Sequence, residues 1–191
     1  YILFYAAEFN KNKSRQLLIR TLALLKSSIP KVRLIFAGEG IFQDECKQLA
    51  IKLGVQNKIH FAGFRNDIDS LLQLSDVAVA SSLREGLPVN LLEAMATRLP
   101  IIATNNRGHR ELVTNNYNGF IPVSNVPSLF ASKILSLYKD PDAKTKLGEN
   151  SLLQVQKYAL SKVKNEMAAI YTEFMSEEDH GSKSKYYRAN L

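Results

Sequence analysis

The sequence has little of what marks secreted, membrane-spanning or metal-binding proteins. It contains one cysteine, Cys46, so no internal disulfide can form, which fits a protein that folds in a reducing compartment. No apolar run is long enough to cross a membrane. Histidine, cysteine and acidic residues do not cluster with the spacing of metal ligands. We therefore expect a cytoplasmic protein with no metal and no other cofactor, in which Cys46 packs rather than reacts.

Two further absences exclude other classes of protein. Lysine and arginine do not alternate with aromatic residues, as platforms for single-stranded nucleic acid require. We therefore interpret the formal net charge of +7 as a solvated basic surface and expect no nucleic-acid partner. The sequence also lacks internal repeats and low-complexity linkers. Its 191 residues fit one domain, since a domain usually holds about 100–200 residues.

What the sequence does contain is a regular alternation of short apolar runs with amphipathic segments. The apolar runs predict strands at residues 2–7, 32–37, 59–61, 77–80, 100–103 and 119–123. Segments of helical periodicity separate these strands. The alternation predicts an α/β fold, a three-layer αβα Rossmann-like domain with a parallel sheet of about six strands. We place this domain at residues 1–175 and expect residues 176–191 to form a polar, mobile tail.

The most informative stretch runs from Glu85 to Glu93 and reads Glu-Gly-Leu-Pro-Val-Asn-Leu-Leu-Glu. It follows a short apolar run and opens a helix that we predict at residues 88–97. Pro88 suits the first helical position, where its missing N–H costs nothing. Gly86 can adopt backbone angles that are closed to other residues. The stretch therefore reads as a strand end, a glycine-bearing loop and the start of a helix.

This loop and helix start suit a sugar diphosphate. The free N–H groups of Val89 and Asn90 would point out of the positive end of the helix, where phosphate binds well. A carboxylate accepts hydrogen bonds at two oxygens and can hold two adjacent hydroxyls. Glu85 and Glu93 would then each grip a sugar ring, one on either side of the diphosphate.

Several motifs in order resemble one enzyme family. Residues 85–96 resemble the E-x7-E signature of retaining, nucleotide-sugar-dependent glycosyltransferases of the family 4 type, the glycosyl transferases group 1. Residues 99–104, Gly108 and residues 111–113 resemble that family's next strand and glycine-loop-helix, and residues 118–121 match its next turn and strand. The likeness runs from about Tyr1 to the helix before Asp140. It implies the C-terminal, donor-binding half of a GT-B enzyme of bacterial exopolysaccharide type.

The resemblance also implies roles for individual residues. Glu85 would position the transferred sugar, and Glu93 would hold the ribose diol. Lys13 matches a family lysine that reaches the donor pyrophosphate, so Glu85 and Lys13 are the catalytic candidates. The donor diphosphate would lie against the backbone of Gly86, Leu87, Pro88, Val89 and Asn90.

Other donor contacts are implied by position. Phe64 and Arg65 follow the third strand, in the loop where the family holds its nucleotide base, and Arg107 is a candidate phosphate or acceptor contact. The family commonly has an arginine five residues before the matching lysine, but this sequence has Glu8 there. Lys13 would then act alone, or Arg84, Arg65 or Arg107 would supply the second charge.

Two further motifs have simpler interpretations. Gly38-Glu39-Gly40 follows a strand, but Gln43 takes the position of the third glycine in a dinucleotide fingerprint. We read a tight turn and keep a Rossmann oxidoreductase as a weak alternative. We interpret Asp67 and Asp69 as capping residues of a helix at residues 68–74.

Two single residues are also interpreted as structural. His109 is expected to be a polar residue on the rim of the site. Arg98 stands where the family usually has glycine, at the end of the helix that Glu93 occupies, so a strained left-handed cap is expected there.

Together these observations predict a domain that binds a nucleotide-diphosphate sugar, with uridine as the expected base, for transfer to a saccharide or lipid-linked acceptor. Because the sequence opens inside a strand-like run, we expect a truncated enzyme that lacks its N-terminal acceptor domain and is inactive alone. The full-length protein would lie in the cytoplasm, with peripheral association at the inner face of the membrane. The alternatives are a nucleotide-sugar epimerase and a non-catalytic nucleotide-binding domain.

Overall fold

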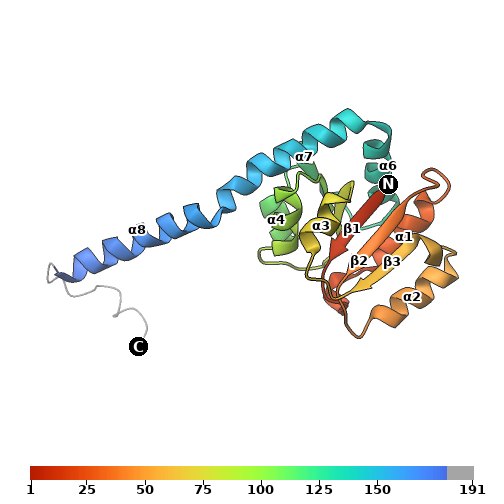
Figure 1. Ribbon diagram of the computed structural model, residues 1–191, viewed down its shortest axis with the longest axis horizontal. Helices are drawn as coiled ribbons and strands as arrows, with labels where there is room; N and C mark the ends of the chain where they lie inside the picture. Colours follow the sequence, from red (N-terminus) through yellow and green to blue (C-terminus); the bar gives the residue numbers. More distant parts are fainter. Residues whose placement is uncertain (180–191) are drawn as a thin grey trace. The chain divides into compact units, whose positions relative to one another are not determined.

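The computed structural model describes residues 1–179 and shows a six-stranded sheet between helices (Figure 1). The strands are β1 (Ile2–Ala6), β2 (Arg33–Ala37), β3 (Ile59–Gly63), β4 (Val77–Ala80), β5 (Ile101–Ala103) and β6 (Gly119–Phe120). The helices are α1 (Gln16–Leu25), α2 (Gln43–Lys52), α3 (Ile68–Gln73), α4 (Val89–Ala96), α5 (Arg107–Leu112), α6 (Pro127–Lys139), α7 (Pro141–Val155) and α8 (Leu160–Asp179). Single turns of 3₁₀ helix are η1 (Lys11–Lys13), η2 (Gln56–Lys58) and η3 (Gln156–Tyr158).

The sheet is parallel and has the strand order β3-β2-β1-β4-β5-β6. Right-handed crossovers place the helices that follow β1 and β2 on one face and those that follow β3 and β4 on the other. Figure 1 accordingly shows α1 and α2 on one side of the sheet and α3 and α4 on the other. All four residues of β4 are buried, as expected for a central parallel strand that is covered on both faces. The predicted three-layer α/β fold is confirmed.

The strand order changes direction between β1 and β4, which pair with each other. The chain leaves β1 toward one face of the sheet and leaves β4 toward the other. The loops that follow these two strands therefore diverge at the carboxyl edge and leave a crevice, which is the usual ligand position in open α/β sheets.

Several predicted boundaries differ from the observed ones by one to three residues. Pro88 is the N-cap of α4 rather than its first helical residue, with extended backbone angles (φ −76°, ψ 96°). The last strand of the sheet, β6, ends at Phe120 instead of residue 123. It ends early because the N–H of Ile121 donates to Oδ1 of Asn115 (2.7 Å) and Pro122 has no N–H to donate.

The cap after α4 has the predicted strain. Arg98 has a φ of 59°, in the left-handed region that disfavours a side chain. The N–H of Leu99 donates to the carbonyl oxygen of Ala94 (3.1 Å), a bond that closes the helix end and holds Arg98 in this conformation.

The chain divides into two compact units, residues 1–155 and the part from Gln156 onward. In the second unit, α8 continues to Asp179, so the first four residues of the expected tail are helical. Residues 180–191 of that tail lie outside the described residues. The proposed division at residue 175 stays a prediction. None of the helices within residues 1–179 is long and apolar enough to cross a membrane.

Candidate functional site

The predicted site forms where two loops meet at the carboxyl edge of the sheet. One loop contains η1 and follows β1, and the other, residues 81–88, joins β4 to α4. Asn12 links them, because its side chain donates to the carbonyl oxygen of Arg84 (2.9 Å) and accepts from the Arg84 N–H (3.1 Å). The carbonyl oxygen of Asn12 also accepts from the N–H of Leu83 (2.8 Å). Sequence analysis missed Asn12, since no local pattern reveals a partner 72 residues away.

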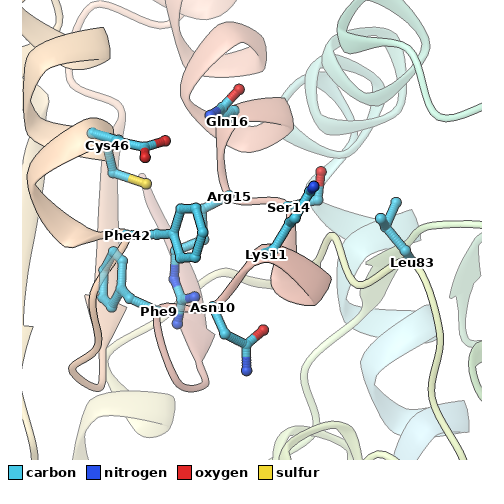
Figure 2. Close-up of a pocket in the computed structure, with 10 residues that line it drawn as sticks. Phe9, Asn10, Lys11, Ser14, Arg15, Gln16, Phe42, Cys46 and Leu83 are labelled. Atoms are coloured by element: carbon cyan, nitrogen blue, oxygen red, sulfur yellow. The ribbon is translucent and has the colours of Figure 1, made fainter.

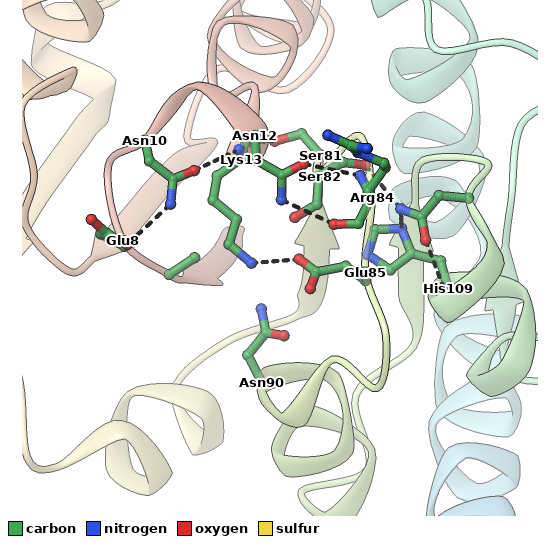
Figure 3. Close-up of polar contacts among 12 residues, drawn as sticks. Glu8, Asn10, Asn12, Lys13, Ser81, Ser82, Arg84, Glu85, Asn90 and His109 are labelled. Carbon is green, nitrogen blue, oxygen red and sulfur yellow. Dashed lines mark hydrogen bonds and ion pairs between the residues drawn. The ribbon is translucent and has the colours of Figure 1, made fainter. Parts of the chain in front are cut away.

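This junction brings Lys13 and Glu85 together as an ion pair (Figure 3). The two side chains are only 19% and 15% exposed. Burial acts to raise the pKa of Glu85, but hydrogen bonds from Lys13 and Ser82 outweigh it and hold that pKa below its ordinary value. Glu85 is therefore ionised at neutral pH, and Lys13 is its counter-ion.

The N-terminal end of α4 lies at the same sheet edge. Val89 and Asn90 carry the first two helical amides, which have no acceptor within the helix. No other acceptor for these two N–H groups occurs among residues 1–179. The Asn90 side chain donates to the carbonyl oxygen of Ala6 (2.9 Å) and so ties α4 to the end of β1. Figure 3 shows the Asn90 side chain, at the start of α4, pointing toward the Lys13–Glu85 pair.

The reason for a glycine at position 86 differs from the predicted one. Gly86 is not in the left-handed region, and a Cβ added there would meet no atom within 4 Å. The next side chain, Leu87, is half-exposed. Glycine therefore leaves open space at this point of the loop, rather than relieving backbone strain.

Close packing depends instead on Gly108, in the first turn of α5. A Cβ at Gly108 would lie 2.4 Å from the carbonyl oxygen of Gly86 and 2.7 Å from that of Glu85. Only glycine allows α5 to touch this backbone. The start of α5 thus supports the segment that carries Glu85.

His109 is fully buried next to this contact, so its predicted place on the rim is wrong. Its Nδ1 lies 2.8 Å from the carbonyl oxygen of Thr104. The same nitrogen lies 2.9 Å from Nδ2 of Asn106. Burial lowers the pKa of His109 and favours the neutral ring, and its Nε2 has no partner within the described part of the chain. Sequence analysis could not see this burial, because it depends on how α5 packs.

His109 belongs to a buried polar network that sequence analysis did not find. Thr104 Oγ1 and Asn106 Nδ2 both donate to the carbonyl oxygen of Ser82, the latter at 2.9 Å. The Ser82 hydroxyl lies 2.7 Å from the hydroxyl of Tyr5. The network therefore joins the carboxyl ends of β1, β4 and β5 below Glu85.

Glu93 lies in α4, eight positions after Glu85 in the sequence. It is exposed, and no group among residues 1–179 donates a hydrogen bond to its carboxylate. Although the side chain as a whole is exposed, desolvation by the neighbouring atoms raises the pKa of Glu93. The carboxylate is available to a ligand, and its predicted role stays a prediction.

The loop after β3 holds Phe64 and Arg65 at the surface. Phe64 is 73% exposed. Arg65 binds both carboxylate oxygens of Asp67, at 2.8 and 2.6 Å, and the hydrogen bond from Arg65 lowers the pKa of Asp67. Asp67 stands at the N-cap of α3 but makes no side-chain capping bond, so its predicted capping role is wrong. The Arg65 guanidinium is already paired, which leaves the loop backbone and the Phe64 ring for a ligand.

Glu8, at the position of the family arginine, is exposed and accepts from Asn10 Nδ2 (3.0 Å). A buried arginine does lie under this loop. Arg15 donates to the carbonyl oxygens of Ala7 and Glu8, and its guanidinium lies 3.7 Å from the centre of the Phe9 ring. Burial lowers the pKa of Arg15 to about 10. Because it is only 3% exposed, Arg15 shapes the loop and does not replace the missing surface cation. Arg84 and Arg107 remain exposed candidates for that charge.

A cavity of about 300 Å³ opens beside η1 (Figure 2). Its wall includes Phe9, Arg15, Phe42, Cys46 and Leu83 and none of the predicted site residues. Cys46 is buried there, and desolvation raises the pKa of its thiol. This environment fits the packing role that we expect for Cys46.

Within residues 1–179, no group of three or more His, Cys, Asp or Glu side chains is placed to hold a metal ion.

Comparison with known proteins yields one consistent family. The family model of the glycosyl transferases group 1 matches residues 1–154. EpsD of Bacillus subtilis, named as a glycosyltransferase, is 45% identical over 175 residues, which are 92% of this chain and 46% of EpsD. The chain therefore spans about half the length of this relative.

Two solved structures share the fold. Anabaena Alr3699/HepE, crystallised with UDP-glucose, superposes with a TM-score of 0.84 at 25% identity, over 91% of this chain and 49% of that one. The C-terminal domain of a glycosyl transferase group 1 family protein of Francisella tularensis, LpcC, superposes with a TM-score of 0.75 at 26% identity, over 83% of this chain and 86% of that domain. One of the two matched structures is thus an isolated C-terminal domain of a glycosyl transferase group 1 family protein.

Proposed function

The chain belongs to the glycosyl transferases group 1 family, and we propose that residues 1–155 bind the nucleotide-diphosphate end of a sugar donor. The observation that carries this proposal is that the unengaged amides of Val89 and Asn90, at the start of α4, lie at the same edge of the sheet as the Lys13–Glu85 ion pair. Amides at a helix N-terminus and a lysine suit a diphosphate. An ionised carboxylate suits adjacent sugar hydroxyls.

The chemistry asked of these groups is to stabilise a leaving diphosphate. As the bond between sugar and phosphate breaks, negative charge grows on the phosphate oxygens. Fixed amide dipoles and the Lys13 ammonium lower the energy of that charge. Because Lys13 is paired with Glu85 before the donor binds, it must turn to the diphosphate. Glu85 is then free to accept hydrogen bonds from the sugar.

The remaining donor contacts follow the same layout. Glu93, whose carboxylate has no hydrogen-bond partner among residues 1–179, would hold the ribose diol. Phe64 and the backbone of its loop would contact the base. We propose a uridine nucleotide, because Alr3699/HepE, which this chain resembles over 91% of its length, was crystallised with UDP-glucose.

The whole protein's activity is a wider proposal. EpsD is about twice as long as the part that matches this chain, so we place the saccharide or lipid-linked acceptor on residues outside the chain described. The domain alone would bind the donor and transfer nothing. The resemblance suggests exopolysaccharide assembly in the cytoplasm, at the inner face of the membrane. EpsD is named as a glycosyltransferase, so the two alternatives, an epimerase and a non-catalytic nucleotide-binding domain, are not favoured.

Calorimetric titration with UDP, GDP and ADP tests the proposal. We expect UDP to bind most tightly, with an affinity that EDTA does not change, because amides and Lys13 take the place of a metal. Glu93→Ala should weaken UDP by about tenfold, the loss of hydrogen bonds to a charged group. Glu149→Ala, at an exposed glutamate of α7, is the matched control. If none of the nucleotides binds, or if Glu149→Ala weakens UDP as much as Glu93→Ala, the proposed site is wrong.

A further inference from the structure

The Gly38-Glu39-Gly40 turn follows β2 and has no part in the function proposed above. Both glycines have positive φ values, 125° and 146°, which residues with a side chain rarely adopt. A Cβ at Gly38 would overlap the carbonyl oxygen of Ala7, and a Cβ at Gly40 would overlap that of Phe9. The turn therefore packs tightly against the loop that follows β1, and only glycine fits at these two positions.

Hydrogen bonds hold the backbone of this turn from two sides. The N–H of Phe9 donates to the carbonyl oxygen of Glu39 (2.6 Å), and the N–H of Gly38 donates to that of Gly63 (2.7 Å). Because Gly63 is the last residue of β3, the turn is fixed between the loop after β1 and the loop after β3. Since both neighbours are glycines, Glu39 supplies the side chain of the turn.

The Glu39 side chain reaches the loop where the proposed function places the base. Its Oε1 accepts from the backbone N–H of Phe64 at 3.4 Å and lies 3.4 Å from the position that a Cβ at Gly63 would take. This hydrogen bond is long and exposed, so a ligand can replace either partner. The N–H of Phe64 and the carboxylate of Glu39 thus present a donor and an acceptor side by side at the surface.

This order of donor and acceptor matches the edge of one kind of base. Uracil carries an acceptor, O4, beside a donor, N3–H, whereas cytosine carries a donor, N4–H₂, beside an acceptor, N3. An amide N–H only donates and a carboxylate only accepts. When O4 of uracil faces the N–H of Phe64, its N3–H faces Glu39. Cytosine in the same position would set donor against donor and acceptor against acceptor.

We propose that Glu39 is a specificity-determining residue that selects uracil over cytosine in the donor nucleotide. The assignment rests on the proposed function, which puts the base at this loop. Because the backbone of the turn is fixed on both sides, the turn cannot shift away to relieve the mismatch with cytosine. A site built to hydrogen-bond one polar group rejects a ligand that lacks it.

UDP and CDP are the matched ligands for the test, because they differ only at this edge of the base. In calorimetric titrations the wild type should bind UDP more tightly than CDP by about tenfold or more. Glu39→Gln keeps the length of the side chain but can turn an N–H toward N3 of cytosine. In Glu39→Gln and in Glu39→Ala, the ratio of the two affinities should therefore fall by about fivefold, the share of one hydrogen bond.

The ratio is the readout because removal of a negative charge near the diphosphate changes the affinity for both nucleotides alike. Glu45→Gln, at an exposed glutamate in the first turn of α2, removes the same charge and should keep the wild-type ratio. Because Glu39 is exposed, its variants should keep the wild-type melting temperature. A merely structural role would lower the melting temperature and weaken UDP and CDP equally.

The failure of this assignment differs from the failure of the proposed function. If the wild type binds UDP and CDP equally, or if both Glu39 variants keep the wild-type ratio, Glu39 does not select the base, although UDP still binds. If the wild type binds neither nucleotide, the proposed function fails and the role of Glu39 fails with it.

Discussion

Removing the charge of Glu85 should strengthen the binding of the bare nucleotide. Lys13 is paired with Glu85 in the ligand-free protein, and the same ammonium is assigned to the diphosphate. Glu85 therefore competes with UDP for Lys13 and also repels the phosphate charge. The substitution Glu85→Gln keeps the shape of the side chain and removes both effects.

The magnitude follows from the exposure of the pair. Ion pairs at a protein surface contribute up to about 1 kcal/mol, and the upper end applies because the two side chains are only 19% and 15% exposed. Repulsion between unit charges about 8 Å apart is about 2 kcal/mol at an effective dielectric constant of about 20, and physiological salt reduces it to less than half. The sum, about 1.5 to 2 kcal/mol, corresponds to UDP binding more tightly by about tenfold or somewhat more.

Isothermal titration calorimetry of UDP and UDP-glucose checks this sign. Glu85→Gln should tighten UDP and lose the preference for UDP-glucose over UDP, whereas Lys13→Met should weaken both ligands. In Lys13→Met, the gain from Glu85→Gln should shrink, because competition for the lysine is absent. Glu149→Gln serves as the matched control. If Glu85→Gln weakened UDP as Lys13→Met does, the shared-lysine reasoning would be refuted.

Three further predictions concern the loop, a helix cap and acid stability. Gly108→Ala should lower the melting temperature and abolish nucleotide binding, because its Cβ would lie 2.4 Å from the carbonyl oxygen of Gly86. In Gly86→Ala the added Cβ meets no atom within 4 Å, so this variant should weaken UDP binding without a change in melting temperature. Equal melting temperatures for the two variants would contradict this prediction. Arg98→Gly should stabilise the fold by about 0.5–1 kcal/mol, since φ is 59° there, and thermal denaturation should show a rise of about 2–4 °C. The pKa of Glu85 in the folded protein lies below its unfolded value. Its stabilising contribution is therefore present above the unfolded pKa, about 4.3, and is lost as pH falls through the folded pKa. Urea unfolding should show that the free energy of unfolding falls more steeply with acid in the wild type than in Glu85→Gln, and the same pH dependence in both proteins would contradict this.

Local pattern was sufficient for the elements themselves. Apolar runs bounded by turn residues placed all six strands, and helical periodicity placed the helices between them, because burial on both faces of a sheet imposes those patterns on the sequence. The left-handed position of Arg98 was predicted from the resemblance, because the family usually has glycine at this helix end. Boundaries failed where a side chain replaced a backbone partner, as Asn115 does at the end of β6.

The sequence by itself determined the fold, the family and the residue types at the edge of the sheet, since each of these is written in short-range spacing. The tertiary structure decided which of those residues meet. Lys13 and Glu85 are 72 positions apart, and they pair because β1 and β4 are neighbours where the strand order reverses. The same packing buries His109 and makes Gly108 rather than Gly86 the glycine that close contact requires. Such contacts depend on how distant strands and helices are placed together, which no local pattern of residues records.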